Sequence, residues 1–210
     1  MSMDPSLIRI LAVDDHPTFR QGIAGLVAAQ SDMRLVAEAA NGQEAIQQFR
    51  AHLPDVTLMD LQMPEMNGLD AMIAIRGEFR EARIIMLTTY MGDVQVLRAL
   101  KAGARGYLLK NSLHRELTDT IRAVHSGRKV LSSEVSCQLA EHAGEDALTP
   151  AETRVLRLIA DGYANKEIGT RLSISEETIK SQVRSILSKL NANDRTHAAM
   201  IGLKRGIIEF

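Results

Sequence analysis

The sequence predicts a two-part protein, an α/β domain built on a doubly wound parallel sheet followed by an all-α domain. Over residues 1–125, short apolar runs alternate five times with stretches of helical periodicity, which is typical of a parallel sheet covered by helices on both faces. From residue 148 onward the periodicity is helical throughout. The length of 210 residues accommodates two such domains.

The five predicted strands are short and almost wholly apolar, as expected for strands that are buried on both faces. They cover residues 8–13, 35–39, 56–59, 84–87 and 106–109, and the amphipathic stretches that follow them centre on residues 19–27, 45–49, 69–73, 94–100 and 117–124. In such a sheet, binding and chemistry belong at the carboxyl ends of the strands.

Residues 126–147 lack a clear period and are rich in Gly, Ser and acidic side chains, so we expect a linker with a short helix around 134–142. The all-α domain then covers residues 148–210. Its first helix is predicted to begin after Thr149, which would be the N-cap, with Pro150 at the first helical position. Glu152 would complete a capping box with Thr149. Three more helices are expected, at about 165–172, from Ser175 onward, and at about 195–205.

Composition narrows the class of protein. Apolar residues make up 45% and charged residues 24% of the chain, which are ordinary globular values. The single cysteine, Cys137, excludes an internal disulfide framework and a cysteine-based zinc site. We find neither a signal peptide nor an apolar run of the roughly 20 residues that a membrane span needs, so we expect a cytoplasmic protein without membrane association.

Charge is distributed unevenly along the chain. The net charge is −1, but residues 148–210 hold 10 Lys and Arg against 7 Asp and Glu. Such an excess at one end favours a nucleic-acid surface there.

Polar side chains gather where the predicted strands end. Asp14 and Asp15 follow the first strand and Asp60 follows the third, while Thr88 and Lys110 end the fourth and fifth. Three carboxylate charges in one pocket are unfavourable unless a divalent cation binds there or one carboxylate is protonated. Ligands that are all oxygen suit Mg²⁺. A carboxylate nucleophile, a metal, a hydroxyl and a lysine together indicate a phosphoryl-transfer site.

Residues 7–125 resemble the receiver domain of two-component response regulators, a flavodoxin-like fold with a five-stranded parallel sheet. The match rests on the Asp14-Asp15 pair, the segment 58–68, Thr88 after its apolar run, and the segment 106–110. The resemblance implies that Asp60 accepts phosphate from the phosphohistidine of a sensor histidine kinase.

The same resemblance assigns the other positions of the pocket. Asp14, Asp15, Asp60 and the backbone carbonyl of Leu61 would hold Mg²⁺. Thr88 and Lys110 would contact the phosphoryl group. Tyr107 would be an aromatic switch that turns inward, although a core aromatic in a strand is an equally good interpretation of that residue.

Two other functions deserve comparison. Phosphatases with an aspartate nucleophile usually carry a second acid two residues later, where this chain has Gln62, which cannot act as an acid. A transcription regulator controlled by a partner or ligand at the receiver domain, without phosphorylation, would keep the fold but would not need the acidic pocket. The chain departs from many receivers at Asn111, where proline is frequent.

Residues 148–208 resemble the LuxR-type helix-turn-helix domain of the NarL/FixJ class of response regulators. The matching positions are 148–152, 155–156, 159–162, 165–168, 172–175, 178–180, 183, 186–190 and 195–196. The resemblance implies that the helices flanking Ser173-Ile174 bind double-stranded DNA and that the helix starting at Ser175 enters the major groove.

The apolar stripe of that helix leaves Lys180, Ser181 and Arg184 pointing outward, and we assign these side chains to base edges. Candidate phosphate contacts are Thr178, Gln182, Lys189, Asn165 and Lys166. Gln182 departs from the family, which usually has His there. Without the surrounding motif, Lys180, Arg184 and Lys189 would fit a solvated helix face equally well.

The last helix pairs two domains in relatives, so the resemblance implies a homodimer when the chain is phosphorylated. Taken together, the sequence predicts a DNA-binding response regulator in which phosphorylation of Asp60 controls dimerisation, DNA binding and transcription. Beyond its own phosphoryl transfer and dephosphorylation, no enzymatic activity is expected.

Overall fold

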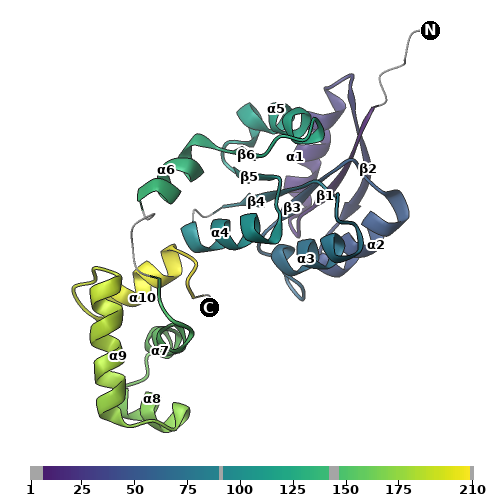
Figure 1. Ribbon diagram of the computed structural model, residues 1–210. Helices are drawn as coiled ribbons and strands as arrows, with labels where there is room; N and C mark the ends of the chain where they lie inside the picture. The colour runs from purple at the N-terminus through teal and green to yellow at the C-terminus, as the bar shows by residue number, and fades with distance from the viewer. Residues whose placement is uncertain (1–6, 90–91, 142–146, 209–210) are drawn as a thin grey trace. The chain divides into compact units, whose positions relative to one another are not determined.

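The computed structural model describes residues 7–89, 92–141 and 147–208 (Figure 1). Its backbone contacts divide the chain into two compact units, residues 1–90 with 96–136, and residues 91–95 with 137–210. Each unit has a hydrophobic core of its own.

The first unit is built on a parallel sheet with the strand order β2-β1-β3-β4-β5-β6. The strands are β1 Ile8–Val13, β2 Met33–Ala39, β3 Val56–Asp60, β4 Ile84–Thr88, β5 Gly106–Leu109 and β6 Val130–Leu131. The first five confirm the predicted strands, and the doubly wound fold class is also confirmed. The five-strand expectation misses β6, which pairs parallel with β5 through Gly106↔Val130 and Tyr107↔Leu131.

Helices cover both faces of this sheet, as predicted (Figure 1). They are α1 Pro17–Ala28, α2 Gly42–His52, α3 Gly68–Glu78, α4 Asp93–Ala102 and α5 Leu113–His125. Alternate strand residues face a shared core with α1 and α5, where Ile10 and Leu58 pack with Ile23 and Ile121. On the opposite face α2 packs beside α3, and the rings of Phe49 and Phe79 lie 5.1 Å apart.

Helix starts are fixed by local side chains. The Asn41 side chain accepts a hydrogen bond from the backbone N–H of Glu44 at the start of α2, and Asn67 does the same for Asp70 at the start of α3. These caps satisfy N–H groups that a helix leaves unpaired. The cap at Asn67 sets the start of α3, with residues 61–67 between it and the end of β3.

The segment 126–147, predicted as a linker, contains β6 and the helix α6 Ser133–Glu141. The short helix expected around residues 134–142 is thus present, and residue 142 lies outside the described residues. A strand of two residues is too short to give a periodic signal, which is why the sequence did not reveal it.

The remaining helices are α7 Pro150–Ala160, α8 Asn165–Leu172, α9 Glu176–Lys189 and α10 Arg195–Lys204. The capping box at the start of α7 is confirmed, since the Thr149 and Glu152 side chains each bond the other residue's backbone N–H. Ser175 caps α9 by accepting from the N–H of Thr178. Along the described residues, each helix is too short or too polar to traverse a lipid bilayer.

Candidate functional site

The carboxyl ends of β1 and β3 bring the predicted carboxylates together. Asp14 follows β1 and is completely buried, and Asp60 ends β3 and is 3% exposed. One ligand atom from each of Asp14, Asp15, His16 and Asp60 lies within 4.8 Å of the others. The acidic pocket expected from the sequence is therefore assembled, and its oxygen-rich donor set fits a divalent cation such as Mg²⁺.

Lys110, directly after β5, bridges two of these carboxylates. Its Nζ atom lies 2.6 Å from Asp14 Oδ2 and 2.8 Å from Asp60 Oδ2. The ammonium group also sits 4.6 Å from the centre of the Phe19 ring, a cation–π contact. The ammonium group thus offsets part of the negative charge that burial makes costly.

His16 follows the Asp pair, and its sequence position favours a surface residue over a ligand, yet it borders the pocket. Its ring is largely solvent-exposed, but Nδ1 lies 2.8 Å from Asp15 Oδ1 and 3.3 Å from Asp14 Oδ1. The backbone N–H of His16 also donates to Asp14 Oδ1. Adjacency to the Asp pair was the available signal for these contacts.

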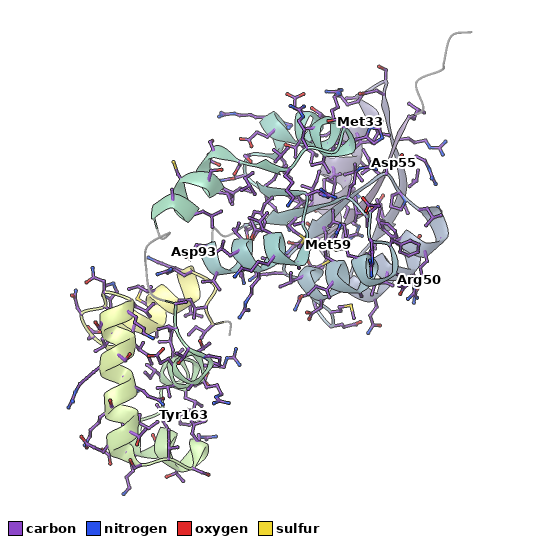
Figure 2. All side chains as sticks on the ribbon, viewed as in Figure 1. Met33, Arg50, Asp55, Met59, Asp93 and Tyr163 are labelled. Atoms are coloured by element: carbon purple, nitrogen blue, oxygen red, sulfur yellow. The ribbon has the colours of Figure 1, made fainter. Side chains whose placement is uncertain are left out.

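The loop after β3 is held close to Asp60. The backbone N–H of Gly68 donates to the carbonyl of Leu61, the predicted backbone ligand, at 3.0 Å. A Cβ atom at Gly68 would lie 1.9 Å from the Asp60 carbonyl oxygen and 2.9 Å from the Cγ of Met59, a buried β3 side chain that is labelled in Figure 2. Only glycine allows the first turn of α3 to approach this closely.

Thr88 and Tyr107 lie on the strands beyond β3. Thr88 ends β4 and is buried, and Tyr107 on β5 is buried completely, with Met86 as its partner across the ladder. The ring of Tyr107 therefore has the inward position expected of either interpretation, a switch or a core aromatic. Burial raises the pKa of its hydroxyl to about 12.

Burial also governs the electrostatics of the pocket itself. Desolvation raises the pKa of Asp60 above its ordinary value, with the Asp14 charge adding to this effect and Lys110 opposing it. Burial by itself would lower the pKa of Lys110, but hydrogen bonds to Asp14 and Asp60 outweigh it and raise that pKa. Asp60 is consequently a carboxylate with little water around it and a fixed cation beside it.

The second predicted site lies on α8, the turn at Ser173 and α9. Ser173 adopts the left-handed conformation with φ of 57°, which turns the chain sharply between the two helices. The buried face of α9 includes Ile179 and Ile186. Ser181 and Arg184 are exposed on the opposite face, as predicted.

Two of the predicted cations on α9 are not free. Lys180 Nζ lies 3.3 Å from Glu176 Oε1 and 3.5 Å from Glu177 Oε2, so acids of the first helical turn hold it. Lys189 Nζ donates to Glu152 Oε2 at 2.8 Å, and Ser185 donates to the other oxygen of Glu152. The sequence did not reveal the contact between Lys189 and Glu152, because these residues lie 37 positions apart on different helices.

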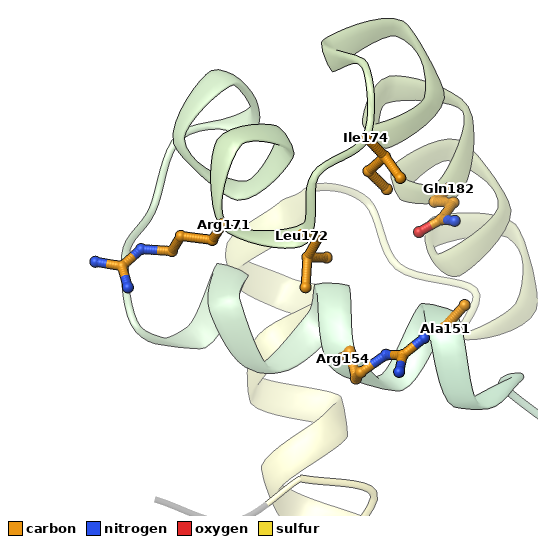
Figure 3. Close-up of a pocket in the computed structure, with 6 residues that line it drawn as sticks. All are labelled: Ala151, Arg154, Arg171, Leu172, Ile174 and Gln182. Atoms are coloured by element: carbon orange, nitrogen blue, oxygen red, sulfur yellow. The ribbon is translucent and has the colours of Figure 1, made fainter.

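The remaining predicted phosphate contacts differ in their surroundings. Lys166 is exposed at the start of α8, and Asn165 precedes it with a buried side-chain oxygen that lacks a hydrogen-bond partner among the described residues. The hydroxyl of Thr178 is hydrogen-bonded to that of Ser175. Gln182 lines a surface hollow beside α9 (Figure 3).

Two family models match this chain. Residues 10–122 match the model of the response regulator receiver domain, and residues 146–201 match that of the bacterial regulatory proteins of the luxR family. The chain belongs to the LuxR family of response regulators. The expected family is thus confirmed.

Individual relatives match this response regulator over nearly its whole length. It is 40% identical over 210 residues to the transcriptional regulatory protein LiaR of Bacillus subtilis, covering 96% of this chain and 100% of the relative. It is 37% identical over 207 residues to the response regulator protein VraR of Staphylococcus aureus, covering 96% and 99%.

Solved structures give the same result. The response regulator ChrA of a heme-sensing two-component system shares 32% identity with a TM-score of 0.58, covering 97% of this chain and 100% of that one. The response regulator RcsB in a complex with DNA shares 26% identity with a TM-score of 0.73, covering 93% and 98%. The present chain is a DNA-binding response regulator of a two-component system.

Proposed function

We propose that phosphorylation of Asp60 by a sensor histidine kinase switches this response regulator between states that differ in dimerisation and DNA binding. The observation that carries the proposal is the buried Asp60 carboxylate, 2.8 Å from the Lys110 ammonium and inside a cluster of ligands that fits a divalent cation. A nucleophile with little surrounding water and a fixed counter-charge suits phosphoryl transfer.

Asp14, Asp15, Asp60 and the Leu61 carbonyl would hold Mg²⁺, which would neutralise carboxylate charge and stabilise the charge on the transferred group. The Asp60 oxygen attacks the phosphorus of the phosphohistidine. The P–N bond breaks, its electron pair stays on the imidazole nitrogen, and that nitrogen takes up a proton. Lys110 then pairs with a phosphoryl oxygen and Thr88 donates a hydrogen bond to another. Tyr107 responds to the movement of Thr88.

On the DNA side, we propose that α9 lies in the major groove with Lys180, Ser181 and Arg184 at base edges. Thr178, Asn165 and Lys166 would contact the backbone directly, and Gln182 would contribute to a backbone contact at the hollow that it lines. Lys189 reaches a phosphate only by leaving Glu152, so its contribution to DNA affinity is expected to be smaller. The receiver's own phosphoryl transfer and dephosphorylation would be the only chemistry of the chain.

Control by a partner or ligand without phosphorylation is the competing function, and one experiment separates the two. The full chain is incubated with Mg²⁺ and a small-molecule phosphodonor, and its intact mass is measured. We expect the native chain to gain one phosphoryl group and the Asp60→Asn variant to gain none. Asn111→Asp, a change outside the acidic cluster, serves as the control and should still be labelled. Equal labelling of Asp60→Asn and native protein would move the phosphosite elsewhere, and an unlabelled native chain would favour phosphate-independent control.

A further inference from the structure

The hollow beside α9 has a volume of about 380 Å³ and is formed by three elements of the DNA-binding unit (Figure 3). It is lined by Ala151 and Arg154 of α7, Arg171 and Leu172 of α8, Ile174 of the turn and Gln182 of α9. Two of these side chains carry a positive charge, and none of the six carries a carboxylate. The lining therefore suits an anion or a polar group that accepts hydrogen bonds.

The two arginines differ in what they contact. The guanidinium of Arg171 stacks 3.9 Å above the Tyr163 ring, and Figure 3 shows it pointing away from the other lining residues. Arg154 is exposed and forms no ion pair or hydrogen bond with the described residues. In Figure 3 its guanidinium extends along α7 below Gln182. Arg154 is thus the cation that is available to a ligand.

Gln182 supplies the second polar group. Its Oε1 atom is buried and has no hydrogen-bond partner among the described residues, an arrangement that costs free energy until a donor arrives. A guanidinium presents five N–H donors in a planar fork. Arg154 can therefore donate to Gln182 Oε1 and still offer a pair of N–H groups to an anion, which makes Gln182 a positioning residue for Arg154.

The position of the hollow on α9 identifies the anion. Ser185, one turn after Gln182, donates to Glu152 of α7, so this flank of α9 faces α7. Ser181 and Arg184 lie on the outward face. With the outward face in the major groove, the flank lies beside the groove, where the sugar–phosphate backbone runs.

We propose that Arg154, oriented by Gln182, binds one phosphate of the DNA backbone at this hollow. The proposal rests on the proposed placement of α9 in the major groove. A guanidinium fork binds two phosphate oxygens at once, which fixes the orientation of the duplex as well as adding affinity. The contact carries no sequence information and would act equally on every duplex.

The test uses fluorescence anisotropy with the full chain after treatment with Mg²⁺ and a phosphodonor. One duplex is selected by the native chain from a random pool, and a second is its scrambled version. Arg154→Gln should weaken binding to both duplexes by the same factor. It should also make the slope of log K against log salt less negative by about 0.9 for each bound chain. The native-to-variant affinity ratio would then be about 3.5-fold larger at 50 mM than at 200 mM salt.

Gln182→Ala tests the positioning role. It should weaken binding to both duplexes, and the double variant should bind no more weakly than Arg154→Gln alone, because Gln182 acts through Arg154. Additive losses would show that Gln182 contacts DNA independently, which overturns the shared site.

Arg157→Gln is the matched control, since Arg157 is an exposed arginine of the same helix outside the hollow. We expect it to leave the salt slope unchanged. Equal effects at positions 154 and 157 would show that Arg154 acts only as general surface charge and not through the hollow. If Arg154→Gln has no effect, or affects the selected duplex alone, the phosphate contact is refuted. A native chain that cannot distinguish the two duplexes would instead refute the placement of α9. Equal thermal midpoints for all variants show that folding is preserved.

Discussion

At the scale of single residues, Lys110 contacts three side chains in and around the acidic pocket. It is shared between Asp14 and Asp60 and packs over Phe19, so in the free protein it occupies part of the electrostatic role that a bound cation would take. Lys110 and a bound cation would therefore compete for the same negative charge, while the proposed phosphoryl contact of Lys110 would form only after transfer.

This competition leads to a prediction for Lys110→Ala. Mg²⁺ affinity should be unchanged or higher, because the two carboxylates lose a neighbouring cation and repel each other more strongly. The gain in DNA affinity after treatment with a phosphodonor should shrink, since the phosphoryl group loses its partner. Isothermal titration with Mg²⁺ measures the first effect and anisotropy the second. Lys101→Ala, on the exposed side of α4, is the control. Weaker Mg²⁺ binding in Lys110→Ala would mean that the lysine holds the pocket together.

The site residues that lie at strand ends could be predicted from the sequence. Asp14, Asp60, Thr88 and Lys110 each terminate or follow a buried apolar run, and parallel pairing then brings those ends to one edge. Contacts set by side-chain length and direction were not predictable. The bridge from Lys110 to two carboxylates and the approach of His16 to the Asp pair depend on rotamers that the pattern does not encode.

At the scale of elements, caps and strand runs were predictable because their determinants lie within a few residues of one another. The capping box of α7 is an example, since Thr149 and Glu152 are three residues apart. The hydrogen bonds that Ser185 and Lys189 of α9 donate to Glu152 could not be predicted, because they depend on how two helices pack. The strand β6 was missed because its two residues are too few to show a periodic pattern.

The junction of β3 and α3 gives a second prediction. Gly68→Ala should lower the free energy of unfolding by about 1–3 kcal/mol, because the new methyl group would collide with the Asp60 backbone. Gly77→Ala in the same helix is the control, since its Cβ would meet no atom within 4 Å. That change should stabilise the protein by about 0.4–1 kcal/mol. Urea unfolding of the two variants measures both effects, and equal stability would show that the loop relaxes without cost.

The link between α7 and α9 gives a prediction of pH dependence. Burial would raise the pKa of Glu152, but hydrogen bonds from Lys189, Ser185 and Thr149 outweigh it and lower the pKa from 4.5 to about 2. A lowered carboxylate pKa stabilises the folded state above pH 4.5, and this stabilisation disappears as the pH falls through 2. It amounts to at most about 3 kcal/mol.

Hydrogen exchange of α7 and α9 amides tests this expectation. Glu152→Gln should increase exchange at pH 7 and make little difference near pH 2, when both compared proteins are measured at the same pH. Glu167→Gln is the control, because Glu167 also caps a helix, through the N–H of Ala164, but has no ion pair among the described residues. A variant whose exchange differs from native equally at both pH values would contradict the ionic origin of the effect.

At the scale of the whole molecule, the acidic pocket lies in one folded unit and the proposed DNA surface lies in the other. Phosphorylation can raise DNA affinity in two ways, by making the DNA surface available or by joining two chains on one operator. The two differ in how many phosphates each complex neutralises. Counting released counterions therefore distinguishes them.

We expect joining of two chains, and this gives the last prediction. The selected duplex should contain two half-sites whose centres lie about 10 base pairs apart or a multiple of that. On this duplex the phosphorylated chain should show a salt slope about twice that on a single half-site, because twice as many backbone contacts release counterions. Arg184→Ala should cost about 1–3 kcal/mol per half-site on the selected duplex and far less on the scrambled one. After the same treatment with phosphodonor, Asp60→Asn should show the single-site salt slope on the duplex with two half-sites as well as on a single half-site. A rise in affinity with no change of slope between one and two half-sites would show that phosphorylation exposes the DNA surface of a single chain.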